Sequence, residues 1–336
     1  MPTPLPPLGN LFEGAQPART AYLRILPLQD QSPILIRVLG WMLIYAPNEA
    51  GRSDVARTIN QCQNDADIVE AGKRYLQYFV KYFRGTSNKP TPTPSNHPSR
   101  PSMDALRDEI LNTIDQAPTS HTDAKNRALV RDNYRCQLTG TIDGRSFMDS
   151  PQLQAELDAN PGLPVSATQC THILPQYIGH HIQAQEARRV NSATIWSIVQ
   201  AFGGIPQGEV NGEGINHLRN IMTLRNDVHF AFDQLWIWLE PVEDEADTYN
   251  VGRCRDGFLS NIPATVTFTS DTELPLPDRR YLALHAACAK VVNMSGAAEY
   301  INSILRDLEK IDVLSQDGSS AHVLDCLLLG ESLAVS

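Results

Sequence analysis

The stretch NDVHFAFD places an imidazole and a carboxylate four residues apart, at His229 and Asp233. If this stretch is helical, both side chains lie on one face of the helix, about one turn apart. An imidazole nitrogen and a carboxylate oxygen in that arrangement can share a divalent cation. The same spacing also suits a plain side-chain hydrogen bond, so the pair needs partners elsewhere in the chain before it indicates a metal site.

Two polar residues precede this pair in an informative order. His172 ends an expected strand in QCTHILP, and Asn220 lies in RNIMTL, nine residues before His229. Taken singly, His172 has the ordinary interpretation of a core histidine, and Asn220 that of a turn residue. The succession of histidine, asparagine, histidine and aspartate, on strand, loop and helix candidates, predicts that the four side chains converge on one cleft.

The elements that must position these residues follow from hydrophobic periodicity and from proline. Residues 1–30 are rich in proline, and we expect them to be irregular. Residues 33–84 have a helical pattern, and the last helix has an apolar stripe that predicts packing. The stripe consists of Ile68, Ala71, Tyr75, Phe79 and Phe83. Closely spaced prolines in residues 85–102 remove donors and fix φ, so this segment is expected to be an exposed linker.

Beyond the linker the character of the chain becomes mixed. Two short helices are expected between residues 103 and 133, followed by strands and turns, and then by helices to the C-terminus. We therefore predict an α+β fold in which a helical N-terminal region leads through a Pro-rich linker to a core domain with added strands. The predicted boundaries are 1–84 for the helical region, 85–102 for the linker, 103–270 for the core and 271–336 for C-terminal helices packed on it.

Composition and charge limit the classes of function. The 42% hydrophobic and 20% charged residues are those of a globular chain, which excludes wholesale disorder. The net charge of −10 argues against a protein that coats nucleic acid through general positive charge. Residues 120–240 carry nine basic and twelve acidic side chains, a balance of −3, so any phosphate contact must be local. Arginines 127, 131 and 135 repeat every four residues, which is typical of a solvated helix face or, alternatively, of a face that contacts a phosphate backbone.

Cysteine usage and hydropathy indicate the compartment. The six cysteines form no Cys-x-x-Cys pair, which argues against a disulfide framework and a zinc ribbon. Cys136 and Cys170 are expected to be buried structural thiols. No secretory signal and no apolar run long enough to span a membrane is visible, so we expect an intracellular protein, cytoplasmic or nuclear, without a membrane partner.

Four short motifs now appear in order: RCQLTG ending at Gly140, THILP (Thr171 to Pro175), RNIMTL (Arg219 to Leu224) and HFAFD (His229 to Asp233). This combination resembles the HNH endonuclease superfamily. It is most similar to fungal HNH-domain proteins, whose core reads Cys-x-x-Thr-Gly, His-Ile-x-Pro, Asn and His-x-x-Phe-Asp. The resemblance covers roughly residues 125–240, about a third of the chain.

The resemblance implies a ββα-metal core that grips one divalent ion, with Mg²⁺, Mn²⁺, Ni²⁺ and Zn²⁺ all left open. It implies that His172 is the general base, that Asn220 holds the loop and orients this base, and that His229 and Asp233 lie on the metal side. One departure stands out: many active HNH nucleases have a metal-binding Asp or His before the first motif histidine, and this chain has Thr171. Two arginines are candidates for contacts to the substrate phosphate: Arg219, which begins the third motif, and Arg225, which directly follows it.

Three functions remain open at this point. The first is a metal-dependent nuclease of the HNH type that hydrolyses phosphodiester bonds in nucleic acid. The second is a binding or regulatory protein that keeps the HNH fold without cleavage, which Thr171 and the acidic balance favour. The third is the same scaffold used for small-molecule chemistry, since fold alone does not fix function.

Overall fold

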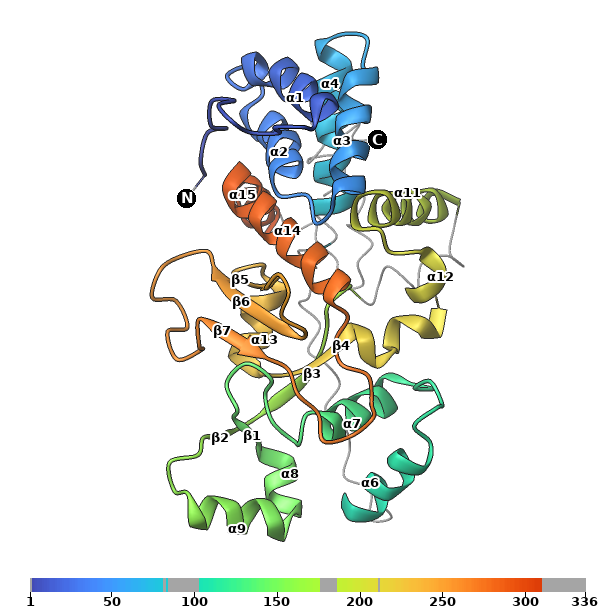
Figure 1. Cartoon of the computed structure of the whole chain (residues 1–336), viewed down its shortest axis with the longest axis vertical. Coiled ribbons are helices and arrows are strands. Elements are labelled where there is room, and N and C mark those ends of the chain that lie inside the picture. Colours follow the sequence, from blue (N-terminus) through green and yellow to red (C-terminus); the bar gives the residue numbers. More distant parts are fainter. Residues whose placement is uncertain (1, 81–82, 84–102, 176–185, 211, 310–336) are drawn as a thin grey trace. The chain divides into compact units, whose positions relative to one another are not determined.

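The computed structural model describes residues 2–80, 83, 103–175, 186–210 and 212–309 (Figure 1). It contains both helices and strands, as expected for an α+β chain. The chain divides into two compact units, a helical unit (1–84, 185–205 and 286–336) and a mixed unit (85–184 and 206–285). Within the described ranges, no helix has the length and apolar character needed to cross a membrane. The predicted linker lies outside these ranges.

The helical unit is built from α-helices contributed by three separate stretches of the chain. They are α1 (Gln16–Ile25), α2 (Pro33–Ile44), α3 (Glu49–Gln61), α4 (Asp65–Tyr75), α11 (Glu186–Gly203), the end of α14 (Arg279–Ser295) and α15 (Ala297–Glu309). A 3₁₀ turn follows α1 (η1, Leu26–Leu28), and α4 continues into a π-helical turn (η2, Leu76–Val80). Asn48 and Asn64 cap α3 and α4 by accepting from the amides of Gly51 and Asp67.

Packing in this unit agrees with the predicted helical pattern and corrects one expectation. Within the apolar stripe, Ile68, Tyr75, Phe79 and Phe83 are buried. The first thirty residues, expected to be irregular, contain α1, because Pro17 lies in the first helical turn, where no hydrogen-bonded N–H is needed. At Gly51 a Cβ atom would lie 2.1 Å from the carbonyl oxygen of Phe202, so this glycine permits the close approach of α3 and α11.

The mixed unit combines short helices with three small sheets. Its helices are α6 (Met103–Asn112), α7 (His121–Arg131), α8 (Gly144–Asp149), α9 (Pro151–Ala159), α12 (Gln207–Val210), α13 (Asn226–Asp233) and the start of α14. The 3₁₀ turns are η4 (Gly212–Asn216) and η5 (Leu218–Asn220). The sheets are the parallel pair β1 (Ile142–Asp143) and β2 (Val165–Ser166), the antiparallel pair β3 (Thr168–His172) and β4 (Ile221–Arg225), and the antiparallel sheet β5 (Ile237–Pro241), β6 (Thr248–Arg253) and β7 (Thr265–Thr267).

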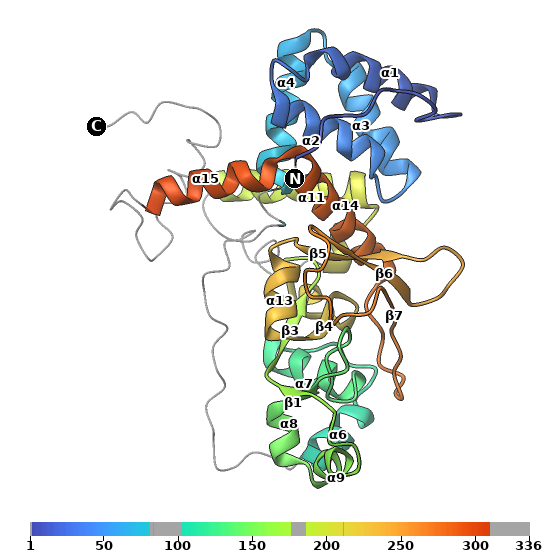
Figure 2. The ribbon, with the colours of Figure 1, turned by 90° about the vertical axis from the view of Figure 1, so that its left-hand side faces the viewer.

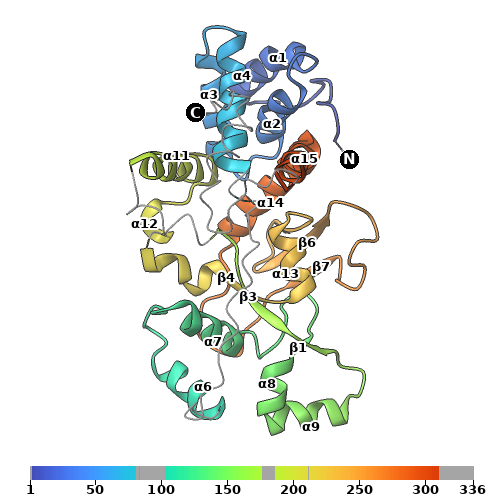
Figure 3. The same ribbon diagram turned by 180° about the vertical axis from the view of Figure 1, so that it is seen from behind.

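The β3–β4 ladder brings distant parts of the sequence together. Its register pairs Thr168 with Arg225 and His172 with Ile221. Helix α13 begins directly after β4 and packs on both strands, as two views of the ribbon show (Figures 2 and 3). The two motif strands and the motif helix are therefore contiguous in space, although β3 and β4 are separated by 48 residues of chain.

The C-terminal helices belong mainly to the helical unit. From Ala286 onward, α14 and α15 are part of this unit. The domain boundaries drawn from the sequence stay a prediction.

A buried ion pair organises the centre of the mixed unit. Arg131 and Asp132 are both fully buried, and Arg131 Nε and Nη2 lie 2.6 and 3.0 Å from the Asp132 carboxylate. The other guanidinium hydrogens go to three carbonyl oxygens, so all five donors are used. The acceptors are Leu218 (2.8 Å), Ile221 (2.8 Å) and Pro275 (3.1 Å).

The arginine repeat in and just beyond α7 therefore belongs to neither of the faces expected from the sequence. Arg131 is fully buried, and Arg127 is 5% exposed and bonded to Asp123 and Thr113. Arg135 is the most exposed of the three, and it pairs with Glu156. The side chains of the repeat are therefore used for hydrogen bonds and ion pairs within the protein.

Replacing Arg131 by Met should destabilise the mixed unit strongly, because it leaves the Asp132 charge buried without its partner. Breaking a buried pair costs about 3–5 kcal/mol. Urea unfolding of the full chain measures the loss. Arg135→Met is the matched control: its ion pair is partly exposed, and its removal should cost no more than about 1 kcal/mol. Equal losses in the two variants would contradict the role given to Arg131.

Candidate active site

His172 occupies the last position of β3. Its Nε2 lies 3.1 Å from Oδ1 of Asn216, and its ring stacks on that of His121 with centroids 5.5 Å apart. Burial lowers the pKa of His172 to about 4, and the Asn216 hydrogen bond opposes this shift only partly. The imidazole is therefore neutral at pH 7. With Asn216 Oδ1 as acceptor, the ring proton sits on Nε2, and Nδ1 keeps a lone pair.

Asn220 is fully buried just before β4 and makes three side-chain hydrogen bonds. Its Oδ1 accepts from the Leu174 amide at 2.8 Å, and its Nδ2 donates to the carbonyls of Leu174 (3.1 Å) and Ile215 (2.9 Å). These bonds fix the turn that follows His172 and the residue that precedes Asn216. Asn220 thus positions His172 from both sides through the backbone, and the structure records no direct bond between the two side chains.

His229 and Asp233 lie on one face of α13, with Nε2 and Oδ2 3.0 Å apart. Both side chains are partly exposed, at 18% and 29%. Their charges act on His172: Asp233 raises its pKa, and His229 lowers it. His172, His229 and Asp233 are therefore close enough for their charges to interact, and Asn220 holds the backbone next to His172.

Thr171 faces away from this neighbourhood. Adjacent residues of a strand point to opposite sides of a sheet, and the Thr171 side chain is fully buried. Its Oγ1 has no hydrogen-bond partner among the described residues. The departure from the motif therefore removes a ligand position and puts a core side chain in its place.

The donor atoms fit a cation held by few protein ligands. Within the described residues, no group of three or more His, Cys, Asp or Glu side chains is placed to hold a metal ion. One imidazole nitrogen and one carboxylate oxygen remain, at His229 and Asp233. Such a set suits an ion that takes its other ligands from water and substrate phosphate, as Mg²⁺ commonly does.

The two candidate phosphate-binding arginines and the two candidate structural cysteines differ in exposure and hydrogen bonding. Arg225 binds Asp227 through Nε (2.6 Å) and Nη2 (2.8 Å), so much of its hydrogen-bonding capacity is used locally. Arg219 is exposed. Cys136 and Cys170 are free, buried thiols, and burial raises the pKa of Cys170 to about 12, which makes it a poor nucleophile at neutral pH.

Sequence reasoning missed three residues that contact the motif residues. Asn216 bonds to His172, and His121 stacks on the same ring. His285 is buried against α13, with its ring parallel to that of Phe232 at 3.7 Å and its Nε2 3.2 Å from the Phe232 carbonyl oxygen. None of the three lies in a recognisable motif; the only local signal is the cap at Ser120, which places His121 at the start of α7.

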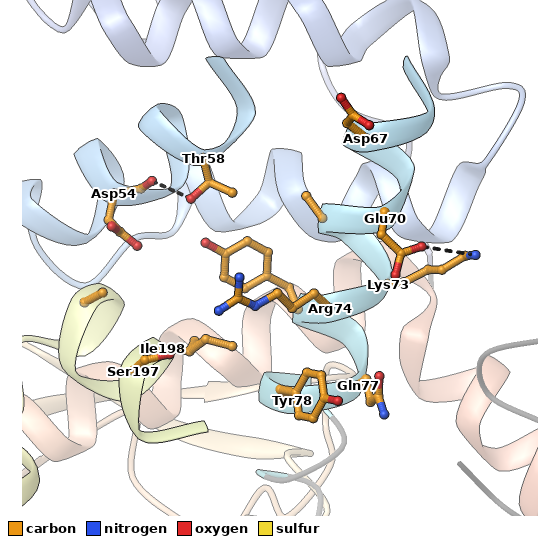
Figure 4. Close-up of a pocket in the computed structure, with 13 residues that line it drawn as sticks. Asp54, Thr58, Asp67, Glu70, Lys73, Arg74, Gln77, Tyr78, Ser197 and Ile198 are labelled. Atoms are coloured by element: carbon orange, nitrogen blue, oxygen red, sulfur yellow. Dashed lines mark hydrogen bonds and ion pairs between the residues drawn. The ribbon is translucent and has the colours of Figure 1, made fainter. Parts of the chain in front are cut away.

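A separate cavity of about 960 Å³ lies in the helical unit (Figure 4). Side chains of α3, α4 and α11 line it, together with Gln77 and Tyr78 of the π-helical turn. Its lining contains neither histidine nor cysteine, and two of its acidic groups are engaged: Asp54 pairs with Arg57, and Glu70 with Lys73. The small-molecule alternative stays a hypothesis.

The comparisons with known proteins identify one domain. Residues 136–240 match a family model described as HNH endonuclease. The match begins at Cys136 and includes β3, β4, α13 and the predicted site residues carried by these elements. Neither the curated proteins nor the solved structures gave a match to the chain. The fungal character stays a prediction from the motifs.

Replacing Asn220 by Asp should loosen the frame around His172. A carboxylate can still accept from the Leu174 amide, but it cannot donate to the two carbonyl groups, which are left unsatisfied. The free energy of unfolding should fall by about 1–3 kcal/mol, and the Leu174 amide should exchange its hydrogen faster. Asn250→Asp, on an exposed strand position, is the control and should change neither quantity. Unchanged exchange at Leu174 would contradict the positioning role.

Stability should also decline in mild acid. Burial lowers the pKa of both His172 and His285 to about 4, against 6.5 for a free side chain. The unfolded chain therefore binds more protons between these values, and the free energy of unfolding falls as the pH drops from 6.5 toward 4. Denaturant titrations at several pH values measure this slope. His285→Phe, which keeps an aromatic ring but does not titrate, should make it shallower; an identical slope would show that His285 does not contribute.

Proposed function

We propose that this chain is a metal-dependent nuclease of the HNH type that hydrolyses phosphodiester bonds in nucleic acid. The observation that carries the proposal is positional. The segment that matches the HNH endonuclease family carries a neutral imidazole, His172, at the end of a strand on which the helix with the His229–Asp233 pair packs. These are the groups that phosphodiester hydrolysis requires: a base for the attacking water and a cation near the phosphate.

His172 is the proposed general base. Its pKa of about 4 keeps it unprotonated at neutral pH, so the lone pair on Nδ1 can accept a proton from water. Asn216 holds the opposite nitrogen, and Asn220 fixes the backbone on both sides of this contact. A base held in this way loses little freedom when the substrate arrives, which is the physical advantage of a rigid frame.

His229 and Asp233 are the proposed ligands of one divalent cation, which is consistent with the general use of such ions by HNH domains. A bound cation would neutralise the scissile phosphate and stabilise the leaving oxygen. Because the chain supplies only this imidazole and carboxylate, the substrate phosphate and water must complete the coordination. Arg219, exposed at the end of η5, is the proposed additional phosphate contact, with Arg225 in a secondary role because Asp227 already binds it.

The alternative is an HNH-fold protein that binds without cleaving. The buried Thr171 favours it, since the position before His172 supplies no ligand. The acidic balance of the chain favours it too. The two functions differ in one measurable property: a nuclease requires a divalent ion to act, and a binding protein does not.

Plasmid nicking by the purified chain with Mg²⁺, Mn²⁺, Ni²⁺ or Zn²⁺ tests the proposal. His172→Ala should lower the cleavage rate by about 10²- to 10⁴-fold, as expected for loss of a general base, with metal binding by calorimetry largely intact. His229→Ala and Asp233→Ala should weaken metal binding, and excess metal should partly restore their cleavage but not that of His172→Ala.

The control is Asn250→Ala, because Asn250 is exposed on β6 and lies on none of the elements that carry the proposed site. It should keep cleavage near the wild-type rate. If the wild-type chain neither cleaves with any of these ions nor binds them, the nuclease proposal fails and the binding alternative replaces it.

A further inference from the structure

An exposed aromatic ring lies next to the proposed metal ligands. Phe230 follows His229 on α13 and keeps 55% of its surface exposed. The described part of the chain has four exposed large hydrophobic side chains, and Phe230 is the aromatic one among them; the others are Leu23, Met148 and Val165. Burying a phenylalanine is worth about 1.5–3 kcal/mol, so leaving this ring in water forgoes stability.

The ring is held in place. Phe230 makes an edge-to-face contact with Trp236, with centroids 5.4 Å apart and planes at 81°. Trp236 in turn makes the same kind of contact with Phe258 at 5.7 Å. Both backbone polar groups of Trp236 are hydrogen-bonded: its N–H donates to the carbonyl oxygen of Ala231, and its carbonyl oxygen accepts from the N–H of Cys254. Phe230 is therefore a supported ring with an open surface.

Helix geometry places this ring at the edge of the proposed site. At 100° per residue, Phe230 and Asp233 lie about 60° apart around α13, in the i, i+3 relation of neighbouring side chains. Their Cβ atoms are then about 5–6 Å apart. A nucleotide whose phosphate reaches His229 and Asp233 thus has its base within reach of Phe230.

The segment 120–240 has no excess of positive charge, so general attraction between the protein surface and phosphates adds little to the affinity. Arg225 is paired with Asp227, both near the exposed side of α13, and the whole segment 120–240 has a balance of −3. Proteins that hold nucleic acid through phosphates need a basic surface and release counterions. Stacking on an aromatic face needs no such charge, and it requires a base that is not already stacked in a duplex.

We propose that Phe230 is a stacking platform for an unpaired nucleobase, so that the substrate of this site is a single-stranded or locally unpaired nucleic acid. This inference rests on the proposed function, which supplies the polynucleotide, and it adds the conformational class of the substrate. DNA and RNA both supply such a base. The experiment below distinguishes between the two.

The test measures binding without cleavage. Fluorescence anisotropy of the full chain in EDTA is recorded with an oligothymidylate, an oligouridylate and a hairpin duplex at several salt concentrations. The wild-type chain should bind at least one single strand more tightly than the duplex, with a shallow salt dependence. Phe230→Ala should raise the Kd for that strand about 5- to 100-fold without changing the salt slope, which is the range for loss of one base stack.

The controls separate stacking from folding. Phe230→Trp should restore tight binding, and Met148→Ala, which removes an exposed hydrophobic side chain from α8, should leave the Kd unchanged. Thermal unfolding should show Phe230→Ala to be folded. Nicking is scored separately: if the wild-type chain cleaves nothing but Phe230→Ala still weakens binding to single strands, the nuclease proposal fails and the stacking inference stands.

Three results would overturn the inference while leaving the nuclease proposal intact. The first is equal affinity of the wild-type chain and Phe230→Ala for both single strands. The second is binding to the duplex alone, or no detectable binding to single strands. The third is that Phe230→Ala abolishes self-association of the chain in sedimentation without affecting oligonucleotide binding, which would make the ring a contact between copies.

Discussion

The buried pair of Arg131 and Asp132 is the constraint on which the mixed unit depends. A guanidinium and a carboxylate taken out of water are costly, and the cost is offset only when every donor and acceptor finds a partner. Here the arginine reaches carbonyl groups on both sides of Asn220, at Leu218 and Ile221. Asp132 accepts from the Thr223 amide at 3.0 Å and from Gln137 at 2.6 Å. The pair thereby fixes the start of β4, from which Asn220 and α13 take their positions.

The chemistry proposed for the site depends on this rigid backbone frame and on the small number of proposed protein ligands, His229 and Asp233. His172 is neutral because it is buried, and it is oriented because Asn216 and the Asn220 frame leave its ring little freedom. If His229 and Asp233 hold a divalent cation as proposed, they do not saturate it, so the affinity for the cation and the affinity for the polynucleotide would be coupled. Such coupling is reciprocal: each partner strengthens the binding of the other by the same factor.

The sequence was sufficient for the parts of the site that rest on local periodicity. The four-residue spacing of His229 and Asp233 placed both on one face of a helix, and the structure has that helix. It was insufficient for Arg131, because an arginine repeated every four residues has the pattern of a solvated face. Asp132 is its neighbour in sequence, but its carbonyl partners lie 87 to 144 positions away in the chain. His121 and Asn216 were missed for the same reason, since a ring stack or a single hydrogen bond across the fold leaves no periodic trace.

The three hydrogen bonds of Asn220 have a consequence for how the chain is organised. They join Leu174 to Ile215, and the chain between these residues includes α11, which belongs to the helical unit. The side-chain amide of Asn220 therefore holds together the two ends of a long loop of chain, at Leu174 and Ile215. The entropy of closing such a loop grows slowly, by about 0.6 kcal/mol for each doubling of its length. The segment between Leu174 and Ile215 can therefore change in length at little entropic cost to these hydrogen bonds, which keep the backbone beside His172 in place.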